Sequence, residues 1–129
     1  MMNIMKMLLT IAIFCNSLFA AEEVSIVALL AAPGKFHNVE VIIDGVVKLE
    51  ESDPAVFISK EASENNVSTL APGLSLSEDA CRLLKERYGN NTYLKIRGVM
   101  KVRSKETVNL GTSYQLGYIE NVKVLRAVR

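Results

Sequence analysis

The sequence predicts a mainly-β domain: a five-stranded Greek-key barrel with a helix between the third and fourth strands and a short N-terminal helix. Two long segments, 39–50 and 92–103, alternate apolar and polar side chains with the period of a half-buried strand. Each has a glycine near its centre, Gly45 and Gly98, and glycine often marks a bend at a barrel corner. A well-capped helix, 78–88, directly precedes the second long strand.

Residues 1–20 are predicted to be a secretory signal peptide. Lys6 is followed by an apolar run from Met7 to Cys15, and small residues follow at Ala20 and Ala21. The run is about half of the ~20 residues that a membrane span needs. We therefore expect cleavage after Ala20 or Ala21, no membrane span after cleavage, and a periplasmic or secreted location. A retained anchor and a lipid attached at Cys15 are the alternatives.

Residues 21–129 fit one domain, which is long enough to bury a core without disulfides. A short helix over 26–32 is capped by Ser25 and ended by Pro33 and Gly34, after which Phe36 is expected to return to the core. In the strand that follows, alternate residues are predicted to face the core: Val39, Val41, Ile43, Gly45, Val47 and Leu49. Their neighbours are predicted to face outward: Glu40, Ile42, Asp44, Val46, Lys48 and Glu50.

The middle of the chain carries weaker signals. A turn over 51–54 leads to a second, short strand over 55–59. Residues 60–67 are polar and compatible with a helical turn. A third strand is expected somewhere in 68–76, interrupted near Pro72 and Gly73.

The second half begins with the helix that Ser77 caps and Gly89 ends. Its predicted apolar stripe consists of Ala80, Leu83, Leu84 and Tyr88. We expect Leu84 to pack into one end of the barrel. After the fourth strand, 92–103, a polar loop over 104–113 leads to a fifth strand from Tyr114 to about Val124.

This order of elements resembles the OB-fold, a Greek-key barrel with a helix between strands three and four. The segment Leu29-Leu30-Ala31-Ala32-Pro33-Gly34-Lys35-Phe36-His37-Asn38-Val39-Glu40-Val41-Ile42-Ile43-Asp44-Gly45 adds to the likeness. It is similar to the entry of small exported bacterial OB domains, where a short helix, a proline and an aromatic residue precede a Val-x-Val-x-x-x-Gly strand. The fold hosts many functions, so the resemblance implies a binding module and no particular ligand.

Charge is divided between the two halves of the chain. Residues 21–80 contain three basic and eleven acidic side chains, and residues 81–129 contain eleven basic and three acidic ones. The outward face of the fourth strand carries five ligand-binding candidates: Tyr93, Lys95, Arg97, Lys101 and Arg103. Phe57 of the second strand is the sixth. A cationic face with an aromatic residue can bind single-stranded nucleic acid. We favour a different interpretation, in which these cations pair with Glu40, Asp44 and Glu50 of the neighbouring first strand, and we do not expect a nucleic-acid partner.

Motifs for catalysis, metal binding or cofactor binding are not found. His37 is the single histidine, so a His-based metal site or a catalytic triad lacks its partners. The acidic residues Glu50, Glu51 and Asp53 lack the spacing of a calcium loop and fit a solvated turn better. Cys81 is expected to be a buried helix residue rather than one half of a disulfide to another chain.

We therefore expect an exported, non-enzymatic binding module for a protein, peptide or glycan ligand, with no catalytic residue, metal or cofactor. The alternative is a small accessory or structural subunit of an envelope complex. An exposed apolar patch around Phe57 or on the leading helix would favour that alternative. Binding of single-stranded nucleic acid or another polyanion through residues 93–103 ranks behind both.

Overall fold

The computed structural model describes residues 20–50, 53–67, 71–102 and 116–128. The elements are, in chain order, β1 (Glu22–Glu23), α2 (Ile26–Ala31), the 3-10 helix η1 (Pro33–Phe36), β2 (Glu40–Lys48), β3 (Ala55–Phe57), α3 (Lys60–Glu64), β4 (Gly73–Leu74), α4 (Glu78–Tyr88), β5 (Thr92–Val102) and β6 (Gly117–Ala127). Residues 1–19 of the predicted signal peptide, Arg103 and the 104–113 loop lie outside the described residues. No helix within the described part of the chain is long and apolar enough to cross a membrane.

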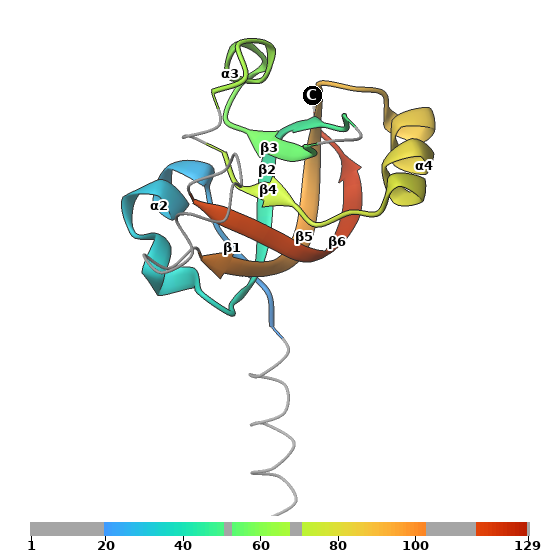
Figure 1. The fold of residues 1–129 in the computed structure, drawn as a ribbon. Coiled ribbons are helices and arrows are strands. Elements are labelled where there is room, and N and C mark those ends of the chain that lie inside the picture. The colour runs from blue at the N-terminus through green and yellow to red at the C-terminus, as the bar shows by residue number, and fades with distance from the viewer. Residues whose placement is uncertain (1–19, 51–52, 68–70, 103–115, 129) are drawn as a thin grey trace, which may run out of the picture.

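The strands close into a barrel in the order β2-β3-β4-β6-β5, and β5 pairs with β2 to complete the circle (Figure 1). All these pairings are antiparallel except that of β4 with β6, which is parallel. The predicted fold is confirmed: a mainly-β, OB-fold-like Greek-key barrel of five strands, with α4 between the third and fourth of them and α2 in front. The third strand, β4, is only two residues long, because Gly73 and Leu74 are the residues that pair with β6.

Several strand boundaries differ from the sequence prediction, and one strand was not predicted. The first long strand, β2, spans Glu40–Lys48 rather than 39–50. The second strand, β3, ends at Phe57, and β6 continues to Ala127 rather than ending near Val124. The unpredicted strand is β1, which pairs in parallel with Val41 and Ile42 of β2. Two adjacent glutamates carry no strand periodicity that a sequence analysis could detect. The pairing is possible because β3 covers only Val46–Lys48 of β2 and leaves the backbone of Val41 and Ile42 available to β1.

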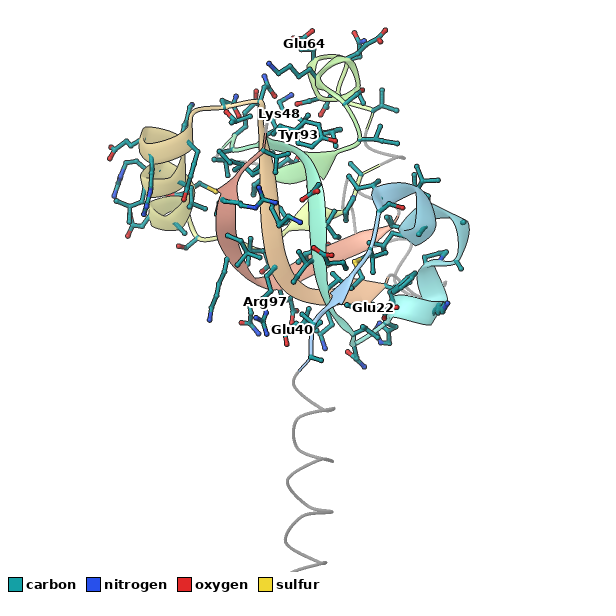
Figure 2. All side chains as sticks on the ribbon, turned by 180° about the vertical axis from the view of Figure 1, so that it is seen from behind. Glu22, Glu40, Lys48, Glu64, Tyr93 and Arg97 are labelled. Atoms are coloured by element: carbon teal, nitrogen blue, oxygen red, sulfur yellow. The ribbon has the colours of Figure 1, made fainter. Side chains whose placement is uncertain are left out.

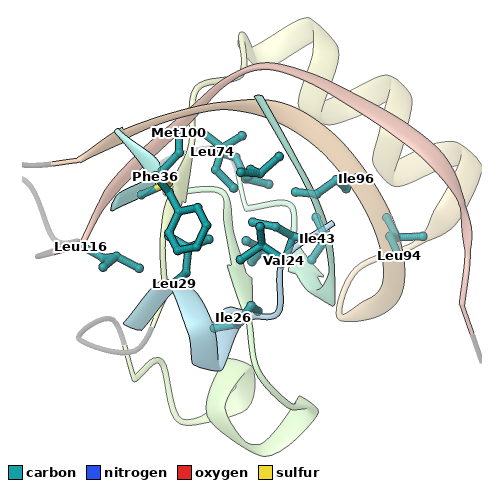
Figure 3. Packing of buried hydrophobic residues seen from close by; sticks show 14 of the residues in the cluster. Val24, Ile26, Leu29, Phe36, Ile43, Leu74, Leu94, Ile96, Met100 and Leu116 are labelled. Carbon is teal, nitrogen blue, oxygen red and sulfur yellow. The ribbon is translucent and has the colours of Figure 1, made fainter. Parts of the chain in front are cut away.

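The core fills the barrel and continues under α2 (Figure 3). The inward residues of β2 and β5 alternate as predicted, and Leu29 of α2 and Phe36 of η1 close one end of the barrel against Met100 and Leu116. Ser25 caps α2 by accepting a hydrogen bond from the backbone N–H of Ala28 at 3.0 Å. The prediction that Phe36 returns to the core is confirmed.

The two central glycines are positions where another chain segment passes too closely for a side chain. A Cβ on Gly98 would lie 2.7 Å from the carbonyl oxygen of Glu120 on β6, where the β5–β6 register shifts between Arg97 and Val99. A Cβ on Gly45 would lie 2.9 Å from Ile26 Cδ1 and 3.0 Å from the Phe57 carbonyl oxygen. The glycines therefore permit the strand crossings that bend the sheet into a barrel.

Helix α4 lies on the opposite side of the barrel from α2 (Figure 1). Its inward side consists of Cys81, which is buried, and Leu84 and Tyr88, which are half-buried against the core. Leu83 was predicted to belong to this stripe, and that prediction is wrong, because Leu83 is 62% exposed. Successive helical residues point about 100° apart, so a helix that buries Cys81 and packs Leu84 inward turns Leu83 to solvent.

Candidate functional site

The outer face of the barrel changes character along the β2–β5 ladder. At one end, Phe57 of β3, Val46 of β2 and Tyr93 of β5 lie opposite one another in register across three strands. Phe57 and Val46 are fully buried in a second apolar cluster beside α3, and Tyr93 packs against this cluster. Phe57 therefore does not form an exposed patch, although the sequence made it a surface candidate.

Two residues further along the ladder, Lys95 of β5 lies opposite Asp44 of β2. Lys95 Nζ is 3.5 Å from Asp44 Oδ1 and donates a hydrogen bond to Glu23 Oε1 of β1 at 2.9 Å. The hydrogen bond raises the pKa of Lys95 and lowers the pKa of Glu23. Lys95 is thus a cation held between two carboxylates, and its side chain is only 15% exposed.

The next charged group along β5 is Arg97, which pairs with Glu40 of β2 near the other end of the ladder (Figure 2). A hydrogen bond from Arg97 Nε to Glu40 Oε1 lowers the pKa of Glu40. The predicted pairing across the strands is confirmed for Lys95 with Asp44 and for Arg97 with Glu40. For Glu50 the prediction is wrong, because the Glu50 carboxylate lies beside Lys48 of its own chain segment at 3.6 Å.

A pocket of about 450 Å³ lies between the apolar end of this face and its charged end. The residues that line it are Glu23, Val24, Ser25, Ile26, Val27, Ile42, Asp44, Ile58, Tyr93 and Lys95. They come from the outer faces of β2 and β5, from the chain after β3, and from the continuous segment that runs from the end of β1 to the start of α2. This volume is within the range of small-molecule sites, roughly 300–1,000 Å³.

One wall of the pocket depends on the N-terminal segment. The backbone N–H of Val24 donates to the Ile42 carbonyl oxygen at 2.9 Å, which extends the β1–β2 pairing and carries the chain across the barrel to α2. This placement leaves Val27 of α2 59% exposed and brings it to the same pocket as Ile58, which is 38% exposed. The pocket therefore combines accessible aliphatic groups with the carboxylates around Lys95.

The structure brings together two of the six candidate residues from the sequence, Tyr93 and Lys95. Arg97 and Lys101 do not line the pocket, and Lys101 Nζ instead donates to Asn38 Oδ1. Arg103 lies outside the described residues. Sequence reasoning missed Glu23, Val27, Ile42 and Ile58. An aliphatic residue on the outward side of a short helix was the available signal for Val27.

His37 has a structural contact at the end of β5. Its Nδ1 accepts a hydrogen bond from the backbone N–H of Val102 at 3.0 Å, and the neighbouring Asn38 N–H donates to the Met100 carbonyl oxygen at 2.8 Å. These contacts fasten the entry of β2 to the end of β5. Among the described residues, His, Cys, Asp and Glu side chains form no group of three that could hold a metal ion.

Comparison with known proteins found no matching family model, no matching curated protein and no matching solved structure.

Proposed function

We propose that this chain is a non-enzymatic binding module, exported to the periplasm or the extracellular space, that holds its ligand in the pocket between α2 and the outer face of β2 and β5. In this proposal it is a small exported OB-fold protein of the bacterial type that its N-terminal half resembles. The observation that carries the proposal is the pocket itself, because its lining combines exposed aliphatic side chains with an aromatic ring and fixed charges. That combination is typical of ligand sites.

The positions of the lining residues are fixed by the fold. Tyr93 is supported by the cluster around Phe57, and Lys95 is held by Glu23 and Asp44. A site whose polar groups are already oriented loses less entropy when a ligand binds. The geometry of the pocket is thus better suited to selective binding than a mobile surface patch would be.

A library screen by NMR tests this proposal. The full chain, with labelled backbone amides and methyl groups, is titrated with pools of short peptides, small oligosaccharides and organic ions. Binding in the pocket is expected to shift the signals of Val27, Ile58, Tyr93 and Lys95 together. A screen in which no pool shifts this group, or in which all shifts map elsewhere, counts against the pocket as the ligand site.

A pair of variants separates pocket binding from general surface adsorption. Val27→Gln changes an exposed aliphatic residue in the pocket, and Leu83→Gln changes one of similar exposure on α4. Both side chains are mostly solvated, so we expect both variants to fold. Val27→Gln should weaken binding several-fold, and Leu83→Gln should leave it unchanged. Equal effects of the two substitutions would contradict a site at the pocket.

Export is a separate part of the proposal and has its own test. Lys6, the apolar run and the small residues at the predicted cleavage point support it. The intact mass of the protein isolated from its native host should correspond to a chain that begins at Ala21 or Glu22. A full-length product in the cytosol would contradict the proposed location.

The exposed aliphatic residue on the leading helix favours a second candidate function, an accessory subunit of an envelope complex. In that case Val27 and Ile58 would be covered by a partner protein, because exposed apolar groups that lie together commonly mark interfaces. Crosslinking from a photoreactive side chain placed at Val27 in the native host tests it. A single protein crosslinked from Val27 and not from Leu83 would favour the subunit over the small-ligand module.

A further inference from the structure

The charges that a ligand can reach in the pocket are negative, although the pocket contains a lysine. The side chains of Glu23 and Asp44 are 71% and 45% exposed, whereas that of Lys95 is 15% exposed. Lys95 also directs its ammonium group to both carboxylates. The pocket therefore presents accessible oxygen acceptors, and its two carboxylates together exceed the single positive charge of Lys95.

The basic residue of the neighbouring strand does not reverse this balance. Arg126 of β6 lies opposite Lys95, on the side of β5 that faces away from β2. It is not among the residues that line the pocket. Its charge acts on Glu23 only as the weakest of several influences on the pKa of that carboxyl group.

The apolar part of the pocket lies beside these carboxylates. Tyr93 packs against the buried outer cluster, and Ile58 directly follows the end of β3. Val27 belongs to α2 and Ile42 to β2, and all four residues line the pocket. An aromatic face next to carboxylates favours a cation, because the ring quadrupole attracts positive charge. A volume of about 450 Å³ exceeds a single lysine side chain and leaves room for adjacent apolar groups.

From these observations we infer that the pocket binds a polypeptide segment in which a lysine or arginine side chain lies between apolar residues. This inference depends on the proposed function and specifies the ligand. The ammonium or guanidinium group lies against Asp44 and Glu23, and the flanking apolar side chains contact Val27, Ile58 and Tyr93. The charge complementarity selects a cationic ligand over a glycan or an anion.

Three matched peptides test the charge requirement: acetyl-Leu-X-Leu-amide with lysine, norleucine or glutamate at X. They are titrated into the full chain by NMR, at low salt and at about 0.15 M salt. The lysine peptide should bind at least tenfold more tightly than the norleucine peptide and shift the pocket residues, and the glutamate peptide should bind most weakly. The preference for lysine should decrease as salt increases, because screening weakens exposed charge interactions.

Variants of the protein locate the charge that is responsible. Asp44→Asn and Glu23→Gln keep the shape of each side chain and remove its charge. Each should weaken binding of the lysine peptide several-fold and leave the norleucine peptide unchanged. Glu64→Gln, on the exposed side of α3 and outside the pocket lining, is the matched control and should change neither.

The outcomes distinguish the inference from the proposal on which it depends. A glutamate or norleucine peptide that shifts the pocket residues as strongly as the lysine peptide overturns the cationic ligand and leaves the pocket as a binding site. Free butylamine is a further probe, which carries the ammonium group of lysine without a peptide backbone. If it binds as tightly as the lysine peptide, the inference of a polypeptide ligand is wrong and the inference of a cationic ligand stands. Absence of binding by all these probes overturns the inference, and the library screen described above decides whether the pocket binds anything else.

Discussion

The inner and outer faces of the β2–β5 ladder are formed by alternate residues of the same two strands, and they differ in what determines their structure. The inner face contains Val41, Ile43, Leu94, Ile96 and Met100, all almost fully buried. The outer face contains an apolar end around Tyr93, two ion-pair sites and a pocket. The side chains of the inner face take their places because they are apolar and are excluded from water. The environment of each outer side chain depends instead on whether β1, α2 or the chain after β3 packs beside it.

The largest expected effect comes from a pair of neighbours on opposite faces, Ile43 and Ile42. Ile43→Ala should lower the free energy of unfolding by about 2–5 kcal/mol, the usual cost of truncating a buried aliphatic side chain. Ile42 is only half-buried, so Ile42→Ala should cost clearly less. Denaturant titration of both variants measures the difference. Equal losses would mean that the outer face is packed as tightly as the inner one.

The second prediction concerns the closeness of β5 and β6 at Gly98. Gly98→Ala introduces a Cβ against the Glu120 carbonyl oxygen and the Ile119 side chain, and should cost about 1–3 kcal/mol, as overpacking usually does. Gly34→Ala is the control, because no atom lies within 4 Å of its added Cβ. Its effect should stay within about 0.5 kcal/mol. If thermal unfolding shows the two variants to be equally stable, the strands can separate without cost.

The third prediction compares adjacent leucines of α4. Leu84 packs against the core and is half-buried, so Leu84→Ala should cost about 1–2 kcal/mol, below the range for a fully buried leucine. Leu83→Ala should be close to neutral, because that side chain is mostly in solvent. Chemical denaturation decides between them. A larger loss from Leu83→Ala would contradict the orientation of the helix.

The outer face should contribute to the pH dependence of stability. Glu23 and Glu40 have pKa values lowered from 4.5 in the folded state, so their contribution is present above that value and is lost as the pH falls through the folded pKa values. The pKa of Lys95 is raised from 10.5, so its contribution is present below that value and is lost as the pH rises above it. Lys95→Met should remove the contribution of Lys95 to the alkaline loss, and it should reduce the acid loss because Glu23 then lacks its hydrogen-bond donor. Lys85→Met, on the exposed side of α4 and outside the pocket lining, serves as the control in melting curves from pH 3 to 11.

The smallest effect should come from exchanging the charges of one exposed pair. Arg97→Glu places a carboxylate beside Glu40 and should lower the melting temperature by a few degrees, because like charges on neighbouring strands repel. Adding Glu40→Arg in the same molecule should restore part of the loss. A double variant that is no more stable than Arg97→Glu alone would show that the two side chains are not energetically coupled. Both changes should leave the proposed ligand binding in the pocket unaffected, because neither residue lines it.

Local patterns predicted most of the barrel because they act within a few residues. The alternation in 39–50 and 92–103, the caps Ser25 and Ser77, and the two central glycines each have a direct physical cause. The error at Leu83 arose because helical periodicity identifies an apolar stripe but not which side of it meets the barrel. The strand β1 was missed because its pairing with Val41 and Ile42 leaves no pattern in two glutamates.

The residues that line the pocket were only partly predictable for the same reason. The sequence by itself determined the alternation of β5, and therefore that Tyr93, Lys95 and Arg97 share one face. Only the tertiary structure decided that Glu23, Val27 and Ile58 meet Tyr93 and Lys95, because these residues come from segments far apart in the chain. Periodicity places a side chain on a face, but contacts between distant segments depend on how the whole barrel closes. The alternation of side chains in β5 was therefore determined by local sequence, whereas the pocket formed because the closed barrel brings distant segments together.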